Sequence, residues 1–64
     1  MVDKETARLF IGKNIQIERL ISGRAIFSKG TLTQVGETDI LLNFNESLQA
    51  YSLDYILSIR EVGE

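Results

Sequence analysis

Apolar and polar residues alternate along most of the chain after residue 13, and this pattern predicts β-strands. Ile15 and Ile17 alternate with polar neighbours, and the Ser22-Gly23 pair that follows is typical of a tight turn. We therefore expect a first strand over residues 14–21 that leads into a hairpin.

The following segment, residues 24–35, is long for a strand. Its apolar residues fall on both parities, with Leu32 on one and Val35 on the other. Gly30 lies in the middle, where a missing side chain lets a strand bend sharply. The pattern predicts one bent strand that serves two sides of a small barrel.

Two more strands and one helical turn are expected in the second half of the chain. A third strand is predicted where three apolar residues alternate: Ile40, Leu42 and Phe44. After a polar break, a fourth strand is expected over residues 48–53, and Asp54 then begins one helical turn. A fifth strand over residues 57–62 completes the pattern.

The N-terminal residues predict a short helix. Asp3 is a good N-cap, and Gly12 provides a stop. One stripe of this helix carries Val2, Thr6, Leu9 and Phe10. Because a helix of about two turns is unstable alone, we expect the stripe to cover an open end of the barrel. The sequence thus predicts a single domain over residues 1–64, mainly β, in which a short N-terminal helix precedes an open, strongly bent, five-stranded antiparallel barrel.

The amino-acid composition excludes several common kinds of catalytic and metal-binding site. The chain has no His and no Cys, so a Cys/His metal cluster, a disulfide and a His-activated serine nucleophile are excluded. We expect no catalysis, no cofactor and no metal site. The longest apolar runs are three residues, far below the about 20 needed to cross a bilayer, so we expect a cytoplasmic protein without a membrane partner.

Charge is distributed unevenly along the chain, whose net charge is −2. Residues 1–30 carry six basic and three acidic side chains, a net charge of +3. Residues 31–64 carry one basic and six acidic side chains, a net charge of −5. A dipolar chain of this kind can present a basic face, although charges of this number also commonly decorate a solvated surface.

Several short motifs support a resemblance to a known family of small barrels. They are Gly12-Lys13 before the first strand, Ser22-Gly23 in the first turn, Gly30 in the bent strand, Ile40-Leu41-Leu42 in the third strand and Ile56-Leu57-Ser58-Ile59 near the end. In this order they resemble the Sm-like family, which includes bacterial Hfq. The resemblance implies rings of six or seven subunits, closed by pairing the fourth strand of one copy with the fifth strand of the next, and RNA bound on the ring.

The family's RNA-binding motifs are altered in this chain. Hfq has an aromatic residue just before its third strand, where this chain has Thr38-Asp39. Hfq has a Tyr-Lys-His run between its last two strands, where this chain reads Tyr51-Ser52-Leu53-Asp54. Tyr51 is the one residue of that run that matches.

The expected edge strands also favour association of the chain with itself. A five-stranded barrel of this size leaves edge strands with unpaired backbone groups, and neither expected edge carries a Pro or an inward Lys. The edges expected to pair are segment 48–53, with Leu48 and Leu53 at its ends, and segment 57–62, with Leu57 and Val62 at its ends.

Five residues are candidates for nucleic-acid binding. Arg19, Arg24 and Lys29 are expected to form a basic patch on the first hairpin, which repetition around a ring turns into a positive belt. Tyr51 and Tyr55 flank the last turn, where their rings either stack on bases or pack in the core or an interface. The leading hypothesis is a non-catalytic, RNA-binding ring, and the alternative is a protein-interaction or assembly module that binds no nucleic acid.

Overall fold

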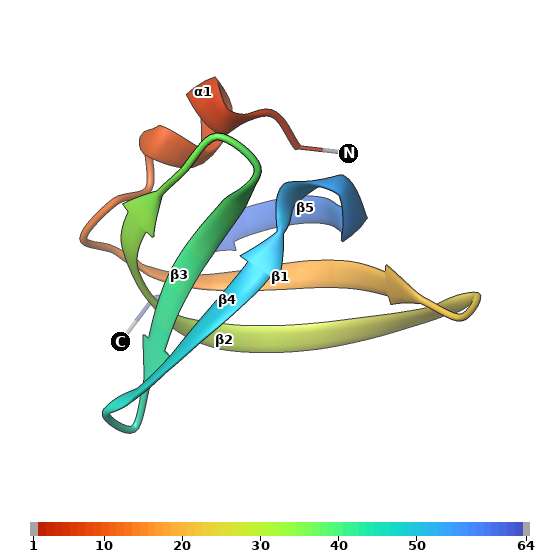
Figure 1. Cartoon of the computed structure of the whole chain (residues 1–64). Coiled ribbons are helices and arrows are strands. Elements are labelled where there is room, and N and C mark those ends of the chain that lie inside the picture. Colours follow the sequence, from red (N-terminus) through yellow and green to blue (C-terminus); the bar gives the residue numbers. More distant parts are fainter. Residues whose placement is uncertain (1, 64) are drawn as a thin grey trace.

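The chain forms one short helix and five strands. The computed structural model describes residues 2–63, so Met1 and Glu64, which the expected domain includes, lie outside the described residues. The elements, shown in Figure 1, are α1 (Lys4–Arg8), β1 (Asn14–Ile21), β2 (Arg24–Val35), β3 (Asp39–Phe44), β4 (Ser47–Ser52), the 3-10 turn η1 (Leu53–Tyr55) and β5 (Ile56–Glu61). No helix within residues 2–63 has the length and apolar character needed to span a membrane.

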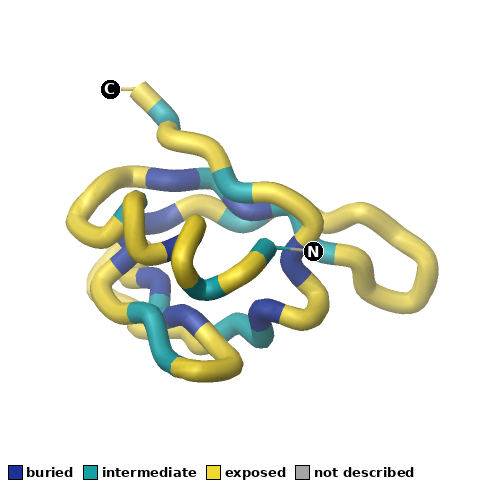
Figure 2. The backbone as a smooth tube through the Cα atoms, turned by 90° about the horizontal axis from the view of Figure 1, so that it is seen from above, coloured by how far each residue is buried: buried dark blue, intermediate teal, exposed yellow. Residues whose placement is uncertain are grey.

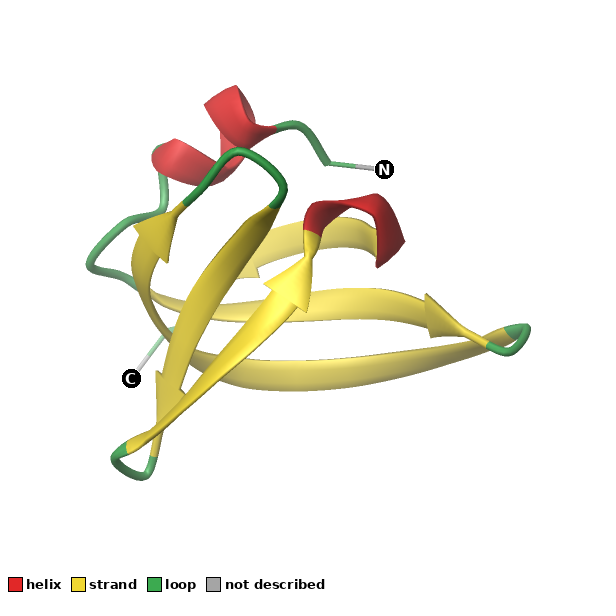
Figure 3. Ribbon diagram, viewed as in Figure 1, coloured by secondary structure: helices red, strands yellow, loops and turns green. Residues whose placement is uncertain are grey.

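The strands form one antiparallel sheet in the order β4-β3-β2-β1-β5. The sheet is open, and β4 and β5 are its terminal strands. In Figure 3 the β3–β4 hairpin crosses the direction of the long β1–β2 hairpin, and α1 lies over one end. The predicted fold class is therefore confirmed, and the two segments expected to be edges overlap the terminal strands, each shifted by one residue.

The sheet curves because β2 changes partner in its middle. β2 pairs with β1 from Arg24 to Thr31 and with β3 from Thr31 to Val35. A Cβ at Gly30 would lie 2.9 Å from the carbonyl oxygen of Asn43, closer than real Cβ contacts come. Glycine is thus required at this position by the close approach of β3, in agreement with the predicted bend.

The core lies inside the curved sheet and under α1. The buried apolar residues come from every element except β4: Ala7, Ile15, Ile17, Leu32, Ile40, Leu42, Leu53 and Ile56. Figure 2 shows the buried segments facing one another, with α1 lying above them. The predicted alternation of Ile15 with Ile17, and of Ile40 with Leu42, is confirmed by their burial.

The predicted apolar stripe of the helix is wrong in part. Ala7 is the buried residue of α1, whereas Thr6 is exposed and Leu9 is 73% exposed. The side of this segment that faces the core runs through Ala7 and Phe10, so Thr6 and Leu9 lie on the side turned toward solvent, although Leu9 keeps αR backbone angles. Val2 and Phe10 do pack against the core.

Phe44 was expected to continue the buried alternation of β3, but it is 52% exposed. The pairing between β2 and β3 stops at Asn43, so no part of β2 covers the residue that follows. Asn45 and Glu46, which come next, both have positive φ and form the two-residue turn between β3 and β4.

The start of the last strand also differs from the prediction. Ser52 caps η1, since its Oγ accepts a hydrogen bond from the Asp54 N–H at 3.3 Å; Asp54 itself lies inside the turn. A bulge in the β1–β5 pairing places Ile56 opposite Arg19. Ile56 is therefore buried, and Leu57, where the strand was expected to begin, is exposed.

Candidate nucleic-acid interface

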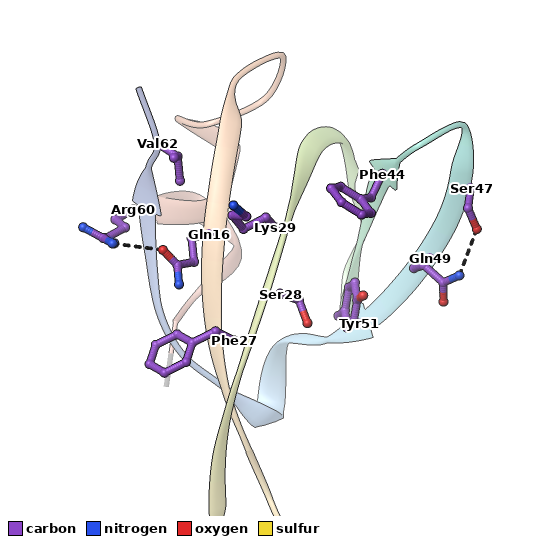
Figure 4. A pocket seen from close by; sticks show the side chains of 10 residues that line it. All are labelled: Gln16, Phe27, Ser28, Lys29, Phe44, Ser47, Gln49, Tyr51, Arg60 and Val62. Carbon is purple, nitrogen blue, oxygen red and sulfur yellow. Dashed lines mark hydrogen bonds between the residues drawn. The ribbon is translucent and has the colours of Figure 1, made fainter. Parts of the chain in front are cut away.

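A hollow of about 660 Å³ lies between β2 and the β3–β4 hairpin, on the side of its turn and β4 (Figure 4). β2 has no partner on this side before residue 31, because β3 pairs only with its second half. The lining residues are Gln16, Phe27, Ser28, Lys29, Phe44, Ser47, Gln49, Tyr51, Arg60 and Val62. These side chains include three aromatic rings and two cations, and no carboxylate.

The aromatic rings of the hollow differ in exposure. Phe27 is 60% exposed and Phe44 is 52% exposed, so both offer ring surface to solvent. Tyr51 is partly buried and packs against the core. Exposed rings beside cations are the groups with which proteins bind unpaired bases and their phosphates.

Arg19 lies behind the hollow and holds Tyr51. Its guanidinium carbon is 4.4 Å from the centre of the Tyr51 ring, and its Nη2 donates a hydrogen bond to Ser28 Oγ at 3.2 Å. Its Nε is buried and has no hydrogen-bond partner within residues 2–63. This residue, expected to contact phosphate directly, instead sits on the core side of β1, opposite Ile26.

Lys29 and Arg60 supply the positive charge of the hollow. Lys29 lies opposite Gln16 on the outer side of the β1–β2 hairpin, and the ion pairs recorded among the described residues do not involve it. Arg60 donates a hydrogen bond from Nη2 to Gln16 Oε1 at 2.9 Å. Arg60 was not predicted from the sequence as a binding residue, although it is the only Lys or Arg in residues 31–64.

The five predicted residues do not gather at one place. Lys29 and Tyr51 line the hollow, and Arg19 lies behind Tyr51. Arg24 is next to the β1–β2 turn, on the opposite face of the hairpin from Lys29. Tyr55 lines a separate hollow of about 320 Å³ with Leu20, Ile21 and Ser22. The expected basic patch of Arg19, Arg24 and Lys29 is therefore divided between two faces, and the role of all five residues stays a prediction.

The ionisable groups whose pKa values are clearly shifted lie away from this hollow. A hydrogen bond from Lys4 and the charge of that residue lower the pKa of the Glu37 carboxyl. The Thr6 N–H, which Asp3 accepts as N-cap at 2.8 Å, lowers the pKa of the Asp3 carboxyl. Among residues 2–63 no group of three or more potential metal ligands occurs.

The free edge of β4 presents three residues outward. The Leu53 N–H donates to the Thr38 carbonyl at 2.8 Å, in step with the β3–β4 register. Hydrogen-bonded positions alternate along an antiparallel ladder, so residues 47, 49 and 51 bond to β3. The backbone groups of Leu48, Ala50 and Ser52 point away from the sheet.

The free edge of β5 follows from the same rule. The Val62 N–H donates to the Asn14 carbonyl at 2.8 Å, in step with the β1–β5 register. Residues 58 and 60 therefore bond to β1, and the backbone groups of Ile59 and Glu61 point outward. Each terminal strand thus carries a row of donors and acceptors that its own sheet does not use.

Comparison with known proteins identifies no family for this chain. No family model, no curated protein and no solved structure matches this chain. The resemblance to the Sm-like family accordingly stays a prediction from the sequence.

Proposed function

We propose that this protein is a non-catalytic, Sm-like domain that binds single-stranded RNA as a homo-oligomeric ring. The observation that carries the proposal is the hollow beside β2, which combines aromatic rings with Lys29 and Arg60 and has no carboxylate in its lining. Bases stack on aromatic rings regardless of sequence, and cations hold the phosphates. The amide groups of Gln16 and Gln49 add donors and acceptors for base edges.

The two free strand edges support ring formation. Antiparallel pairing of β4 of one copy with β5 of the next joins the outward groups of both strands. Matching Ala50 with Ile59 also brings Leu48 opposite Glu61, so two outward positions of each strand are joined, and it places Ser52 opposite Leu57. Such an interface is head-to-tail, so it repeats from copy to copy and forms a ring where the rotation between copies closes.

The side chains support this register. Leu48 is 58% exposed and lies with Ala50 on the face of β4 turned away from the core. Ile59 lies opposite Ile17 on the core side of β5. In the proposed register Leu48 and Ala50 therefore continue the apolar face to which Ile59 belongs, and their burial stabilises the junction.

Ring formation would also compensate for the negative net charge of the chain in RNA binding. A single copy has a net charge of −2, which opposes binding of a polyanion. A ring repeats Lys29 and Arg60 at regular intervals, and a strand that follows them contacts several cations at once. Repetition thereby converts weak single sites into binding of useful strength.

The first test is of assembly. Light scattering on the purified protein should give the mass of a six- or seven-subunit ring, with an absorbance ratio that reveals co-purified RNA. Ala50→Pro removes an outward N–H that the β3–β4 ladder does not use, so it should give a folded monomer. Ala50→Ser is the matched control and should keep the ring. A wild-type monomer would refute the proposed ring.

The second test is of RNA binding. Affinity for a fluorescent single-stranded RNA should fall as salt rises, with a log–log slope of about −0.7 for each phosphate contact. Lys29→Glu combined with Arg60→Glu should weaken binding and flatten the slope. The control is Arg8→Glu combined with Lys13→Glu, an equal charge change outside the hollow. Equal effects of both pairs would refute the assignment of the hollow.

The second candidate function is a protein-interaction or assembly module without nucleic acid. It is favoured by the large apolar side chains that the described residues expose, namely Leu9, Ile11, Leu20, Ile21, Ile26, Phe27, Phe44, Leu48, Tyr55 and Leu57. Protein binding through strand edges responds little to salt, so a salt-insensitive partner and no RNA affinity would favour this function. The cytoplasmic location stays a prediction from the sequence.

A further inference from the structure

The first half of β2 is a third free strand edge. The Leu32 N–H donates to the Lys13 carbonyl at 3.1 Å, which places the backbone groups of Leu32 on the β1 side of β2. Hydrogen-bonded positions alternate along an antiparallel ladder, so the even-numbered residues from 24 to 30 bond to β1. The backbone groups of Ala25, Phe27 and Lys29 therefore point to the other side, where β3 pairs only with the second half of β2.

This edge is open to a partner. Ala25, Phe27 and Lys29 are all exposed, and among residues 2–63 their outward groups make no recorded hydrogen bond. In Figure 3 the tip of the β1–β2 hairpin extends beyond the β3–β4 hairpin. An extended peptide matches the spacing of such a row of donors and acceptors, whereas the backbone of RNA carries no N–H donors. The edge thus favours a peptide.

The side chains beside Lys29 attract negative charge. Lys29 lies opposite Gln16 on β1, and Gln16 lies opposite Arg60 on β5, so the three share one row on the outer face of the sheet. Arg60 Nη2 donates to Gln16 Oε1 at 2.9 Å. The ion pairs recorded among the described residues involve neither cation. A carboxylate on a strand added beside Lys29 pairs with it directly, and Arg60 strengthens the positive field of the row.

The two rows nearer the hairpin tip favour apolar side chains. Phe27 is 60% exposed and lies opposite Glu18, which accepts a hydrogen bond from Ser58 Oγ at 3.3 Å. Ala25 lies opposite Leu20, which is 45% exposed. An aromatic side chain on an added strand pairs with Phe27, and an aliphatic one covers Ala25 and Leu20. A carboxylate beside Phe27 is repelled by Glu18, so the rows differ in the charge that they accept.

We infer that the free edge of β2 binds an extended segment of a partner protein as an added strand. The segment reads acid–x–aromatic–x–aliphatic, with the acid opposite Lys29, the aromatic residue opposite Phe27 and the aliphatic residue opposite Ala25. It runs antiparallel to β2, as every pair in this sheet does, because antiparallel pairing is the more stable kind. The inference goes beyond the proposed function, since it needs neither a ring nor RNA. The segment and RNA share the hollow, so each excludes the other.

The first experiment tests strand addition with a peptide of fixed composition. A fluorescent peptide Thr-Glu-Thr-Phe-Thr-Leu-Thr should bind the wild-type protein saturably in an anisotropy titration. In the inferred register the N–H groups of its Glu, Phe and Leu face β2, and those of its Thr residues face away. N-methylation of the Phe should therefore weaken binding by about tenfold or more, whereas N-methylation of the next Thr should change it by less than about twofold. Equal effects of the two modifications would overturn strand addition.

The second experiment tests the assignment of charge. Lys29→Glu should weaken binding of this peptide by about tenfold, and it should bind a peptide with Lys in place of the Glu more tightly than the wild-type protein does. An unchanged preference for the acidic peptide would overturn the place assigned to its carboxylate.

A third experiment removes one outward N–H from the protein itself. Ala25→Pro should weaken peptide binding, and Ala25→Val, which keeps the N–H, should bind as the wild type does. Circular dichroism checks that both variants fold, and the N-methylated peptides decide the matter without any variant. A wild-type protein that binds single-stranded RNA but not the peptide overturns the inference while the proposed function stands. A protein that binds the peptide as inferred but no RNA supports the inference and refutes the proposed function.

Discussion

Replacing Gly30 with valine tests whether the bend of β2, rather than strand propensity, governs this position. Valine is among the best strand formers, so local preference alone predicts a stabilised β2. The structure leads to the opposite expectation. A Cβ at Gly30 would lie 2.9 Å from the Asn43 carbonyl oxygen, 3.3 Å from its carbon and 3.4 Å from Leu42 Cβ. The nearest contacts are backbone atoms of β3, which cannot rotate away as a side chain can.

The expected cost follows from this close approach. Overpacking of a well-packed site costs about 1–3 kcal/mol, and the two extra methyl groups of valine place the cost at about 2–3 kcal/mol. A domain of 64 residues has a stability of about 3–10 kcal/mol, so the loss is a large part of the whole. With an m-value of about 1 kcal/mol/M in urea, the unfolding midpoint should fall by about 2–3 M.

Urea unfolding followed by circular dichroism measures this shift. Each variant should be measured at two protein concentrations, because the stability of an oligomer depends on concentration. Ala25→Val, an exposed position of the same strand, is the control and should change stability by less than about 0.5 kcal/mol. A Gly30→Val protein as stable as wild type would show that β3 does not need the glycine, and the explanation of the bend would be wrong.

Three further outcomes are expected. Leu42→Ala should lose about 2–5 kcal/mol in urea unfolding because Leu42 is buried, whereas Leu9→Ala should change little because Leu9 is exposed; equal losses would contradict the assigned core. Contact with Lys4 lowers the pKa of the Glu37 carboxyl in the folded protein. The ion pair therefore stabilises the fold above the ordinary carboxyl pKa, and this stabilisation is lost as pH falls through the folded-state pKa. Between pH 7 and pH 3 the melting temperature should therefore fall less for Glu37→Gln than for wild type. Identical pH profiles would speak against a stabilising Lys4–Glu37 ion pair. Arg19→Met should change stability by less than about 1 kcal/mol in urea unfolding, because the lost ring contact and the lost hydrogen bond to Ser28 are offset by removal of a buried N–H that has no partner within residues 2–63; a loss above about 2 kcal/mol would mean that Arg19 makes a contact not described above.

The candidate site was only partly readable from the sequence. Lys29 and Tyr51 were predicted and line the hollow, whereas Phe27, Phe44 and Arg60 were not predicted as binding residues. The aromatic pair was missed because an apolar residue in a strand is ordinarily assigned to the core. Their exposure depends on where β2 leaves its partner, which is a long-range property of the sheet.

The position of Arg19 could have been predicted from the alternation of β1. The period-two pattern that puts Ile15 and Ile17 inside also puts Arg19 on the same side of β1. Its charge favoured a surface position, and the long apolar stem of arginine allows the opposite. The parity of the strand was the better guide at this residue.

The sequence by itself determined the elements and their type. Turn chemistry at Ser22-Gly23, alternation around Ile15 and Ile40, and the glycine in β2 act over a few residues, so they can be read locally. Only the tertiary structure decided which side of each strand is covered, where the β1–β5 bulge moves Ile56 into the core, and which backbone groups of the two edge strands point outward. These outcomes depend on the pairing of residues far apart in the chain, and a shift of one residue in that pairing turns every side chain to the other face.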